Sequence, residues 1–160
     1  MIVYHGGTDI IEEPLVHLGR PKLDFGPGFY VTALREQAVS WANKIADRRG
    51  SPALVNKYYF DQKGAMREFK YMSFGSYDRE WLDFVVNNRL GRKVWKQFDI
   101  VEGGVADDRV IDTVELYMGG YLTEEQAIGR LKYYSPNHQI CFINQQVVDC
   151  HLRFEGIINL

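Results

Sequence analysis

The sequence has few cysteines, almost no excess charge and no long apolar run, and each absence excludes a class of protein. Cys141 and Cys150 are the only cysteines among 160 residues, too few and too close together for a disulfide framework. No run of about 18 apolar residues occurs, so no membrane span is expected. Residues 1–6 (MIVYHG) lack the basic segment and long apolar stretch of a signal peptide. We therefore expect a cytoplasmic protein with no membrane partner.

The net charge is only −2 at pH 7. Proteins that hold nucleic acid mainly through its phosphates need a positive field, so the composition disfavours that class. The residues are otherwise those of an ordinary folded protein, 46% hydrophobic and 25% charged, and 14% are aromatic, which suits a core or pocket walled by rings. No internal repeat or low-complexity linker stands out. We expect a single domain over residues 1–160.

Apolar periodicity and turn residues predict strands and helices in an irregular order. The expected strands are residues 2–5, 29–31, 53–60, 69–74, 98–101, 139–143 and 152–158. The expected helices run from an N-cap at Thr32 to about residue 49, from an N-cap at Asp78, from about 108 to 118, and from a capping box at Thr123 to about 133. Because this order does not repeat βαβ units, we favour an α+β fold.

Three short segments carry side chains that suit a flat, sugar-linked cation. In residues 4–7 (YHGG), His5 can donate a hydrogen bond to a sugar hydroxyl, and Gly6 lets a flat ring approach the backbone. In residues 24–32 (DFGPGFYVT), the Tyr30 ring can stack on a planar cation, with Trp41 on the next helix as an opposite wall. In residues 137–143 (NHQICFI), the Gln139 amide can bind two hydroxyls. Each segment also has a purely structural explanation. His5 can be a structural histidine at a strand end, Trp41 can simply pack in the core, and the Gln139 segment can be a strand with a polar first residue.

Together these segments resemble the three motifs of diphtheria-toxin-type ADP-ribosyltransferases. Poly(ADP-ribose) polymerases have the same order: a His-Gly, a Phe-Gly-Lys-Gly-aromatic-Tyr, and a Glu that opens a hydrophobic strand. Over essentially its full length the sequence is more similar still to a bacterial domain-of-unknown-function family, regarded as ADP-ribosyltransferase-like and linked to toxin–antitoxin loci. Residues 80–89 (EWLDFVVNNR) and 99–109 (DIVEGGVADDR) contribute to this similarity.

The resemblance implies a fold and a set of roles. The fold is ADP-ribosyltransferase-like, two small antiparallel sheets forming a split β core with flanking helices, with NAD⁺ across the cleft between the sheets. His5 holds the adenosine-side ribose, Gly6 the nicotinamide carboxamide, and Gln139 the hydroxyls of the nicotinamide ribose, while Tyr30 and Trp41 flank the nicotinamide. The remaining residues expected to bind the cofactor are Phe25, Gly26 and Gly28 of the glycine-rich loop and Arg20 as a phosphate ligand.

Gln139 stands where the polymerases have glutamate. A glutamine can bind the ribose but cannot take a proton from an acceptor, so chain elongation is not expected. The residues to examine for acceptor chemistry are Glu102, Asp107, Asp108 and Arg109, with Arg109 also an alternative pyrophosphate ligand. Adjacent acids can also bind a metal, and Asp107 and Asp108 can simply cap a helix, where carboxylates are favoured.

The resulting hypothesis is a toxin-type, NAD-dependent mono-ADP-ribosyltransferase that uses NAD⁺ as substrate and needs no metal. Its partners are NAD⁺, a macromolecular acceptor (protein or nucleic acid) and a cognate antitoxin. One alternative is an NAD⁺ glycohydrolase acting at the same site. The other is a non-catalytic module that binds NAD⁺ or nucleic acid, in which Gln139 marks the loss of catalytic activity.

Overall fold

The computed structural model describes residues 1–20, 23–134 and 136–160, without the side chain of Asp108. The strands are β1 (Ile2–Gly7), β2 (Phe29–Val31), β3 (Leu54–Phe60), β4 (Tyr71–Ser73), β5 (Ile100–Gly103), β6 (Gln139–Phe142) and β7 (Leu152–Asn159). The helices are α1 (Arg35–Arg49), α2 (Gln62–Glu68), α3 (Arg79–Arg89), α4 (Asp108–Met118), α5 (Glu124–Leu131) and α6 (Gln145–His151), with short 3-10 turns η1 (Val16–Leu18) and η2 (Val94–Gln97). The predicted α+β class is confirmed.

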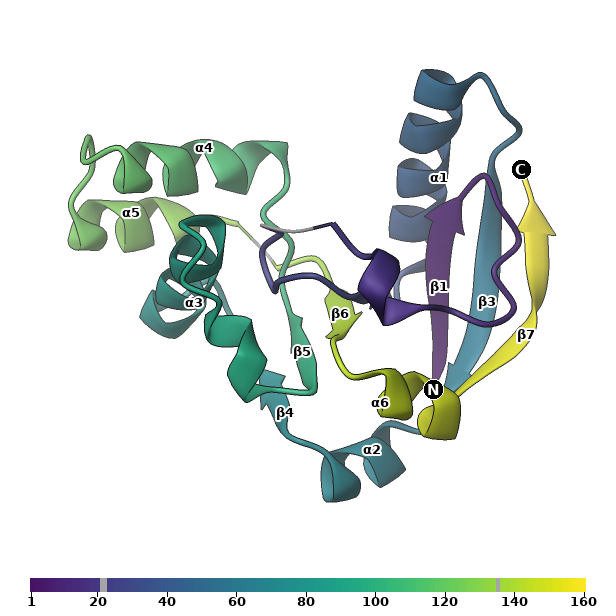
Figure 1. Cartoon of the computed structure of the whole chain (residues 1–160). Helices are drawn as coiled ribbons and strands as arrows, with labels where there is room; N and C mark the ends of the chain where they lie inside the picture. Colours follow the sequence, from purple (N-terminus) through teal and green to yellow (C-terminus); the bar gives the residue numbers. More distant parts are fainter. Residues whose placement is uncertain (21–22, 135) are drawn as a thin grey trace.

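The strands form two sheets (Figure 1). One has three antiparallel strands in the order β1-β3-β7, and the other has four strands in the order β2-β6-β5-β4. The second sheet is mixed, because β4 pairs with β5 in parallel. The expectation of two antiparallel sheets is therefore wrong for this sheet. The cause is the connection between β4 and β5, which carries α3 and η2 and is long enough for a parallel crossover.

The two sheets meet where β1 passes β2. Tyr4 N–H donates to Thr32 O at 2.8 Å and Thr32 N–H donates to Tyr4 O at 2.9 Å, and this isolated bridge is the pairing between the strands. An inter-sheet cluster of buried side chains fills the space between the sheets. Its members are Val3, Phe29, Val31, Tyr58, Phe60, Ala65, Ile100, Ile140, Phe142, Val147 and Val148.

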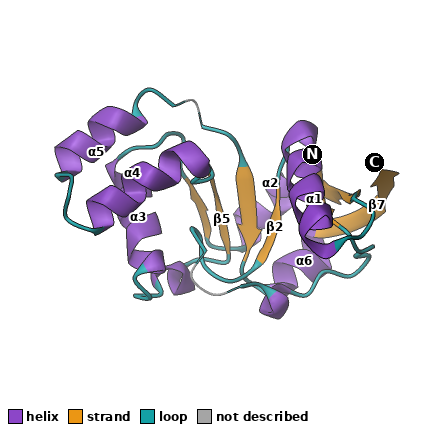
Figure 2. Ribbon diagram, turned by 90° about the horizontal axis from the view of Figure 1, so that it is seen from above, coloured by secondary structure: helices purple, strands orange, loops and turns teal. Residues whose placement is uncertain are grey.

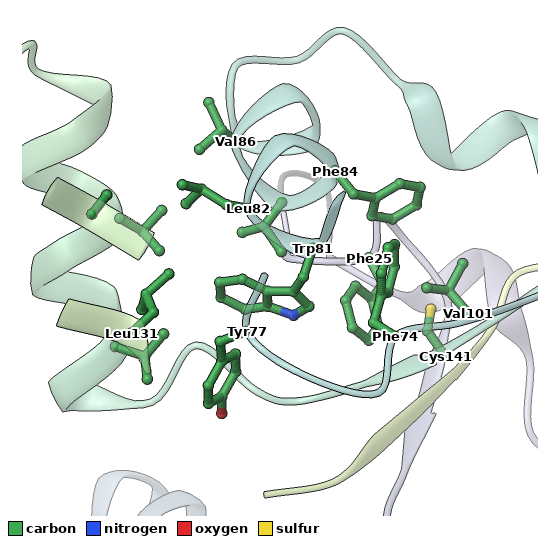
Figure 3. Packing of buried hydrophobic residues seen from close by; sticks show 14 residues of the cluster. Phe25, Phe74, Tyr77, Trp81, Leu82, Phe84, Val86, Val101, Leu131 and Cys141 are labelled. Atoms are coloured by element: carbon green, nitrogen blue, oxygen red, sulfur yellow. The ribbon is translucent and has the colours of Figure 1, made fainter. Parts of the chain in front are cut away.

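Helices cover the other faces of the two sheets. Figure 2 shows α3, α4 and α5 gathered on one side of the molecule and α1 on the other. The three grouped helices enclose a helix-side cluster with Trp81 near its centre (Figure 3). Its members are Phe25, Phe74, Tyr77, Trp81, Leu82, Phe84, Val85, Val86, Val101, Val110, Val114, Ala127, Leu131 and Cys141. Within the part of the chain that is described, no helix is long and apolar enough to cross a membrane.

Helix ends with a local signal lie where they were predicted. Asp78 Oδ1 accepts from Trp81 N at the start of α3, Thr123 forms a capping box with Gln126, and Gly50 ends α1 with φ of 65°. The N-cap predicted at Thr32 is wrong. Thr32 is the partner of Tyr4 in the bridge between the sheets, and α1 begins at Arg35 instead.

Candidate functional site

A glycine-rich loop enters β2 and is fastened to α3 by a nearly buried ion pair. Asp24 Oδ1 accepts from Arg89 Nε at 2.9 Å and from Arg89 Nη2 at 2.5 Å, and Asp24 Oδ2 accepts from Ala106 N at 3.0 Å. Asn88 Nδ2 donates to the carbonyl of Asp24 at 3.0 Å. The loop is therefore held in place by side chains at the end of α3, a role that sequence reasoning did not assign to them.

Two glycines of this loop are required by close packing. Gly26 has φ of 90°, and a Cβ there would lie 2.4 Å from Trp95 Cγ. A Cβ on Gly28 would lie 2.5 Å from the carbonyl oxygen of Phe142 and 2.6 Å from Cys141 Sγ. The loop thus packs directly against the first residues of η2 and against β6, which leaves no room for a side chain at either position.

Tyr30 is anchored to this loop by its hydroxyl group. The hydroxyl donates to the carbonyl of Gly26 at 2.6 Å and accepts from Phe25 N at 3.3 Å. Burial, with smaller contributions from Cys141 and Asp24, raises the pKa of Tyr30 well above its ordinary value. The side chain is therefore a neutral phenol whose ring is held from its far end, and it cannot act as a base.

His5 binds the backbone of Tyr30 at the junction of the sheets. Its Nδ1 lies 2.7 Å from the carbonyl oxygen of Tyr30, and its ring stacks on Phe29 with centroids 4.6 Å apart. A carbonyl only accepts, so Nδ1 carries the proton and Nε2 has the lone pair. Burial lowers the pKa of His5, with the hydrogen bond to Tyr30 acting in the opposite direction. The free ring nitrogen of neutral His5 can therefore accept a hydrogen bond from a hydroxyl, whereas the sequence predicted a donor.

Gln139 opens β6 and is almost fully buried, with 4% of its surface exposed. Its Nε2 donates to the carbonyl of Gly104 at 3.3 Å, and Trp81 Nε1 donates to the same oxygen at 3.0 Å. Within the described residues no donor reaches Gln139 Oε1. The amide is thus oriented by the protein through its nitrogen, and its oxygen is the atom left for a ligand.

The structure brings the three predicted residues onto neighbouring strands but not onto one face. Tyr30 pairs with Cys141, and Gln139 lies two residues from Cys141, so Tyr30 and Gln139 share the face of the sheet that carries the helix-side cluster. The His5 ring lies against Phe29, which belongs to the inter-sheet cluster on the opposite face. A ligand that meets all three must therefore cross the edge of β2 where β1 and β2 separate.

The other residues expected to bind the cofactor differ in their burial and in what they contact. A Cβ on Gly6 would lie 2.0 Å from the carbonyl oxygen of Ala38, so this glycine lets α1 cross β1 closely. The Phe25 ring is fully buried beside Phe74 and Phe84, which makes it a core side chain rather than a lining of the site. Trp41 is half-buried on α1, and Arg20 is exposed in the loop before β2.

Glu102, the first of the acceptor-site candidates, is held by hydrogen bonds on the face of the sheet opposite Gln139. Glu102 accepts from Tyr71 Oη at 2.5 Å, from Gln62 Nε2 at 3.2 Å and from His138 Nε2 at 2.8 Å. Burial raises the pKa of Glu102, but these hydrogen bonds outweigh it and leave the pKa below its ordinary value. Glu102 pairs with Ile140 and so faces away from Gln139. It is a bound carboxylate on the wrong face for this chemistry.

Asp107 caps α4. Its Oδ1 accepts from Arg109 N at 3.2 Å and from Val110 N at 3.3 Å, while its Oδ2 accepts from Asn137 Nδ2 at 3.1 Å. These contacts agree with the plain reading of a helix cap. The side chain of Asp108 lies outside the described part of the structure. Among the described residues no group of three or more His, Cys, Asp or Glu side chains could hold a metal ion.

Sequence reasoning missed a clamp between α1 and the segment before β6. Gln37 Nε2 donates to the carbonyl of His138 at 2.6 Å, and His138 N donates back to Gln37 Oε1 at 3.2 Å. His138 Nδ1 accepts from Ala33 N at 3.0 Å. The polar pair Asn137-His138 just before Gln139 was the available signal. These contacts fix where β6 begins and hence where Gln139 points.

The model of a family described as "Protein of unknown function (DUF3990)" matches residues 1–154. The chain belongs to that family. The comparison with curated proteins gives no match, and neither does the comparison with solved structures.

The DUF3990 match extends from β1 into β7 and therefore includes the His5, Tyr30 and Gln139 segments. The family description assigns no activity, so the residues themselves must carry any functional argument. A pocket of about 610 Å³ opens on this DUF3990 chain between α4 and α5, and its described lining residues do not include His5, Tyr30 or Gln139.

Proposed function

We propose that this DUF3990 chain is an NAD-dependent mono-ADP-ribosyltransferase of the ADP-ribosyltransferase-like fold. The observation that carries the proposal is the contact of His5 Nδ1 with the Tyr30 carbonyl at 2.7 Å, beside the Tyr4–Thr32 bridge between the sheets, with Gln139 on the adjoining strand β6. Three motifs that are distant in the sequence thus lie on neighbouring strands, with His5 on one face and Tyr30 and Gln139 on the other.

Each group has a task that its surroundings support. The neutral Tyr30 ring stacks on the cationic nicotinamide, because a π face attracts positive charge. The free Nε2 of His5 accepts a hydrogen bond from a ribose hydroxyl, and Gln139 Oε1 accepts one from a hydroxyl of the other ribose. Because His5 and Gln139 lie on opposite sides of the β2 edge, an elongated dinucleotide suits them better than a compact ligand.

The reaction breaks the bond between the anomeric carbon of the nicotinamide ribose and the nicotinamide nitrogen, whose ring takes the electron pair. The acceptor forms the new bond to that carbon and releases its proton to solvent. Gln139 stabilises the positive charge that develops on the sugar, as fixed dipoles do. Nothing in this step requires a metal.

The acceptor must already be nucleophilic, because three carboxylates considered for this chemistry, Asp24, Glu102 and Asp107, are engaged. Asp24 pairs with Arg89, Glu102 accepts three hydrogen bonds on the other face, and Asp107 caps α4. The same observation supports a second candidate, an NAD⁺ glycohydrolase in which water is the acceptor. A toxin role with a cognate antitoxin, expected from family resemblance, belongs to the proposal as well.

The test is to incubate the purified chain with labelled NAD⁺ and cell lysate and to follow nicotinamide release. Labelled macromolecule supports the transferase, and free ADP-ribose alone supports the glycohydrolase. Bound NAD⁺ without nicotinamide release would contradict both and leave a binding module.

A further inference from the structure

The pocket of about 610 Å³ lies between two helices that take no part in the site described above. It is lined by Arg109, Asp112 and Thr113 from α4, by Arg130 from α5, and by Tyr133 and Tyr134 just after α5. Figure 1 shows α4 and α5 side by side, joined by a tight turn, so the start of α4 faces the end of α5. This places Arg109 and Arg130 on the rim of one hollow although they are far apart in sequence.

The two arginines of this pocket are unlike several others in the protein. Arg49, Arg79, Arg89 and Arg153 each pair with a carboxylate. Within the described side chains, the guanidinium groups of Arg109 and Arg130 have neither an ion pair nor a hydrogen bond. Asp112 also lines the pocket but lies beyond ion-pair distance of both, so the lining carries two positive charges and one negative charge.

The two tyrosines present rings next to these charges. Tyr133 is 89% exposed, while Tyr134 is half-buried and packs against the helix-side cluster. A ring that is almost wholly in water contributes little to the core and is accessible to a ligand. The Tyr133 ring is available for stacking, beside a Tyr134 ring that is held in place.

We propose that this pocket binds a nucleotide unit of single-stranded nucleic acid. The base stacks on Tyr133, and Arg109 and Arg130 bind the phosphates, since a guanidinium fork matches phosphate geometry. Asp112 only accepts hydrogen bonds and so favours a base that carries an amino group. The weak overall charge agrees with this arrangement, because one or two phosphate contacts need no broad positive surface.

Short chain segments connect the pocket to Gln139 and to Gly104, whose carbonyl binds it. Tyr134 precedes Gln139 by five residues, and Arg109 follows Gly104, whose carbonyl binds Gln139, by five residues. Five residues of extended chain span at most about 18 Å. A strand held in the pocket is therefore within a few nucleotides of the site. That this strand is the ADP-ribose acceptor rests on the proposed function; that the pocket binds it does not.

The test is fluorescence anisotropy with labelled single strands of about 12 nucleotides, RNA and DNA in separate arms, without NAD⁺ and over a salt series. Tyr133→Ala should weaken binding roughly tenfold, the effect of losing one base stack. Arg130→Gln should lower the slope of log K against log salt by about 0.7. The matched controls are Tyr121→Ala, whose ring is 80% exposed, and Arg67→Gln on α2, and both should bind as the unchanged chain does.

Failure of the unchanged chain to bind either strand overturns the proposal, as does binding that Tyr133→Ala leaves intact. Competition by a poly-glutamate peptide that depends on the arginines but not on Tyr133 would instead identify an acidic-peptide site. Nicotinamide release by the unchanged chain, measured in parallel, separates the two proposals. Release without strand binding removes the pocket proposal alone, and strand binding without release removes the transferase alone.

Discussion

Breaking the ion pair between Asp24 and Arg89 should lower the free energy of unfolding more than breaking an ion pair that is exposed to solvent. The Asp24 side chain is 9% exposed and that of Arg89 25%, and the pair holds the loop whose Gly26 carbonyl fixes the Tyr30 hydroxyl. Removing one partner of a buried pair costs about 3–5 kcal/mol, because a charge is left buried and uncompensated. Asp24 keeps its bond from Ala106 N, and Arg89 is partly solvated, so we expect Arg89→Ala to cost about 2–4 kcal/mol.

The measurement is the free energy of unfolding in urea, followed by tryptophan fluorescence. Arg153→Ala is the matched control, because it breaks an ion pair with Glu155 in which the arginine is 74% exposed, and it should cost less than about 1 kcal/mol. The double variant Asp24→Asn/Arg89→Ala removes the stranded charge and should be more stable than Arg89→Ala alone. If Arg89→Ala costs no more than Arg153→Ala, or if Asp24→Asn gives no relief, the account of this loop is wrong.

Three further predictions concern the loop, the ring and the bound carboxylate. Gly26→Ala should destabilise the protein more than Gly91→Ala in urea unfolding: both glycines have positive φ (90° and 81°), but an added Cβ meets the Trp95 ring only at Gly26. Equal losses would mean that the Trp95 contact is unimportant. Tyr30→Ala should weaken NAD⁺ binding by about 1 kcal/mol in calorimetry, while Tyr30→Phe should keep that affinity because it keeps the ring; an unchanged affinity in the alanine variant would remove Tyr30 from the site. Glu102 has a lowered pKa, so its contribution to stability is present above its ordinary pKa of 4.5 and is lost as the pH falls below that value. Thermal unfolding should therefore show a smaller loss of stability between pH 6 and about pH 3 for Glu102→Gln than for the unchanged chain, and parallel pH profiles would refute this.

The sequence predicted those parts of the fold whose signals are local. The caps of α3 and α5 and the glycine that ends α1 are set by residues within one turn. The helices α2 and α6 were missed because each has seven residues, too few to show a helical period, although Asp61 and Asn144 cap them. The parallel pairing of β4 with β5 depends on contacts between distant residues, which no local pattern records.

In the candidate site, too, local features could be predicted from the sequence, whereas features that depend on distant contacts could not. The order of the His5, Tyr30 and Gln139 motifs was visible in the sequence, but the faces on which they lie depend on strand register. The tautomer of His5 is set by a carbonyl 25 residues away in the sequence. The binding of Glu102 by Tyr71, Gln62 and His138 likewise needs three separate segments, so its unsuitability as a base could not be foreseen.

The most direct test of the central claim is single-turnover nicotinamide release by the unchanged chain and by Gln139→Ala, beside a separate NAD⁺ titration. We expect Gln139→Ala to lower turnover far more than affinity, because its contact strengthens as the sugar becomes cationic. Gln139→Glu should keep NAD⁺ binding and release nicotinamide at least as fast into water. Trp81→Phe, which removes the other donor to the Gly104 carbonyl, controls for lost packing and should release nicotinamide at the unchanged rate while folded. Unaltered turnover in Gln139→Ala, or no release from the unchanged chain with NAD⁺ bound, would contradict the account.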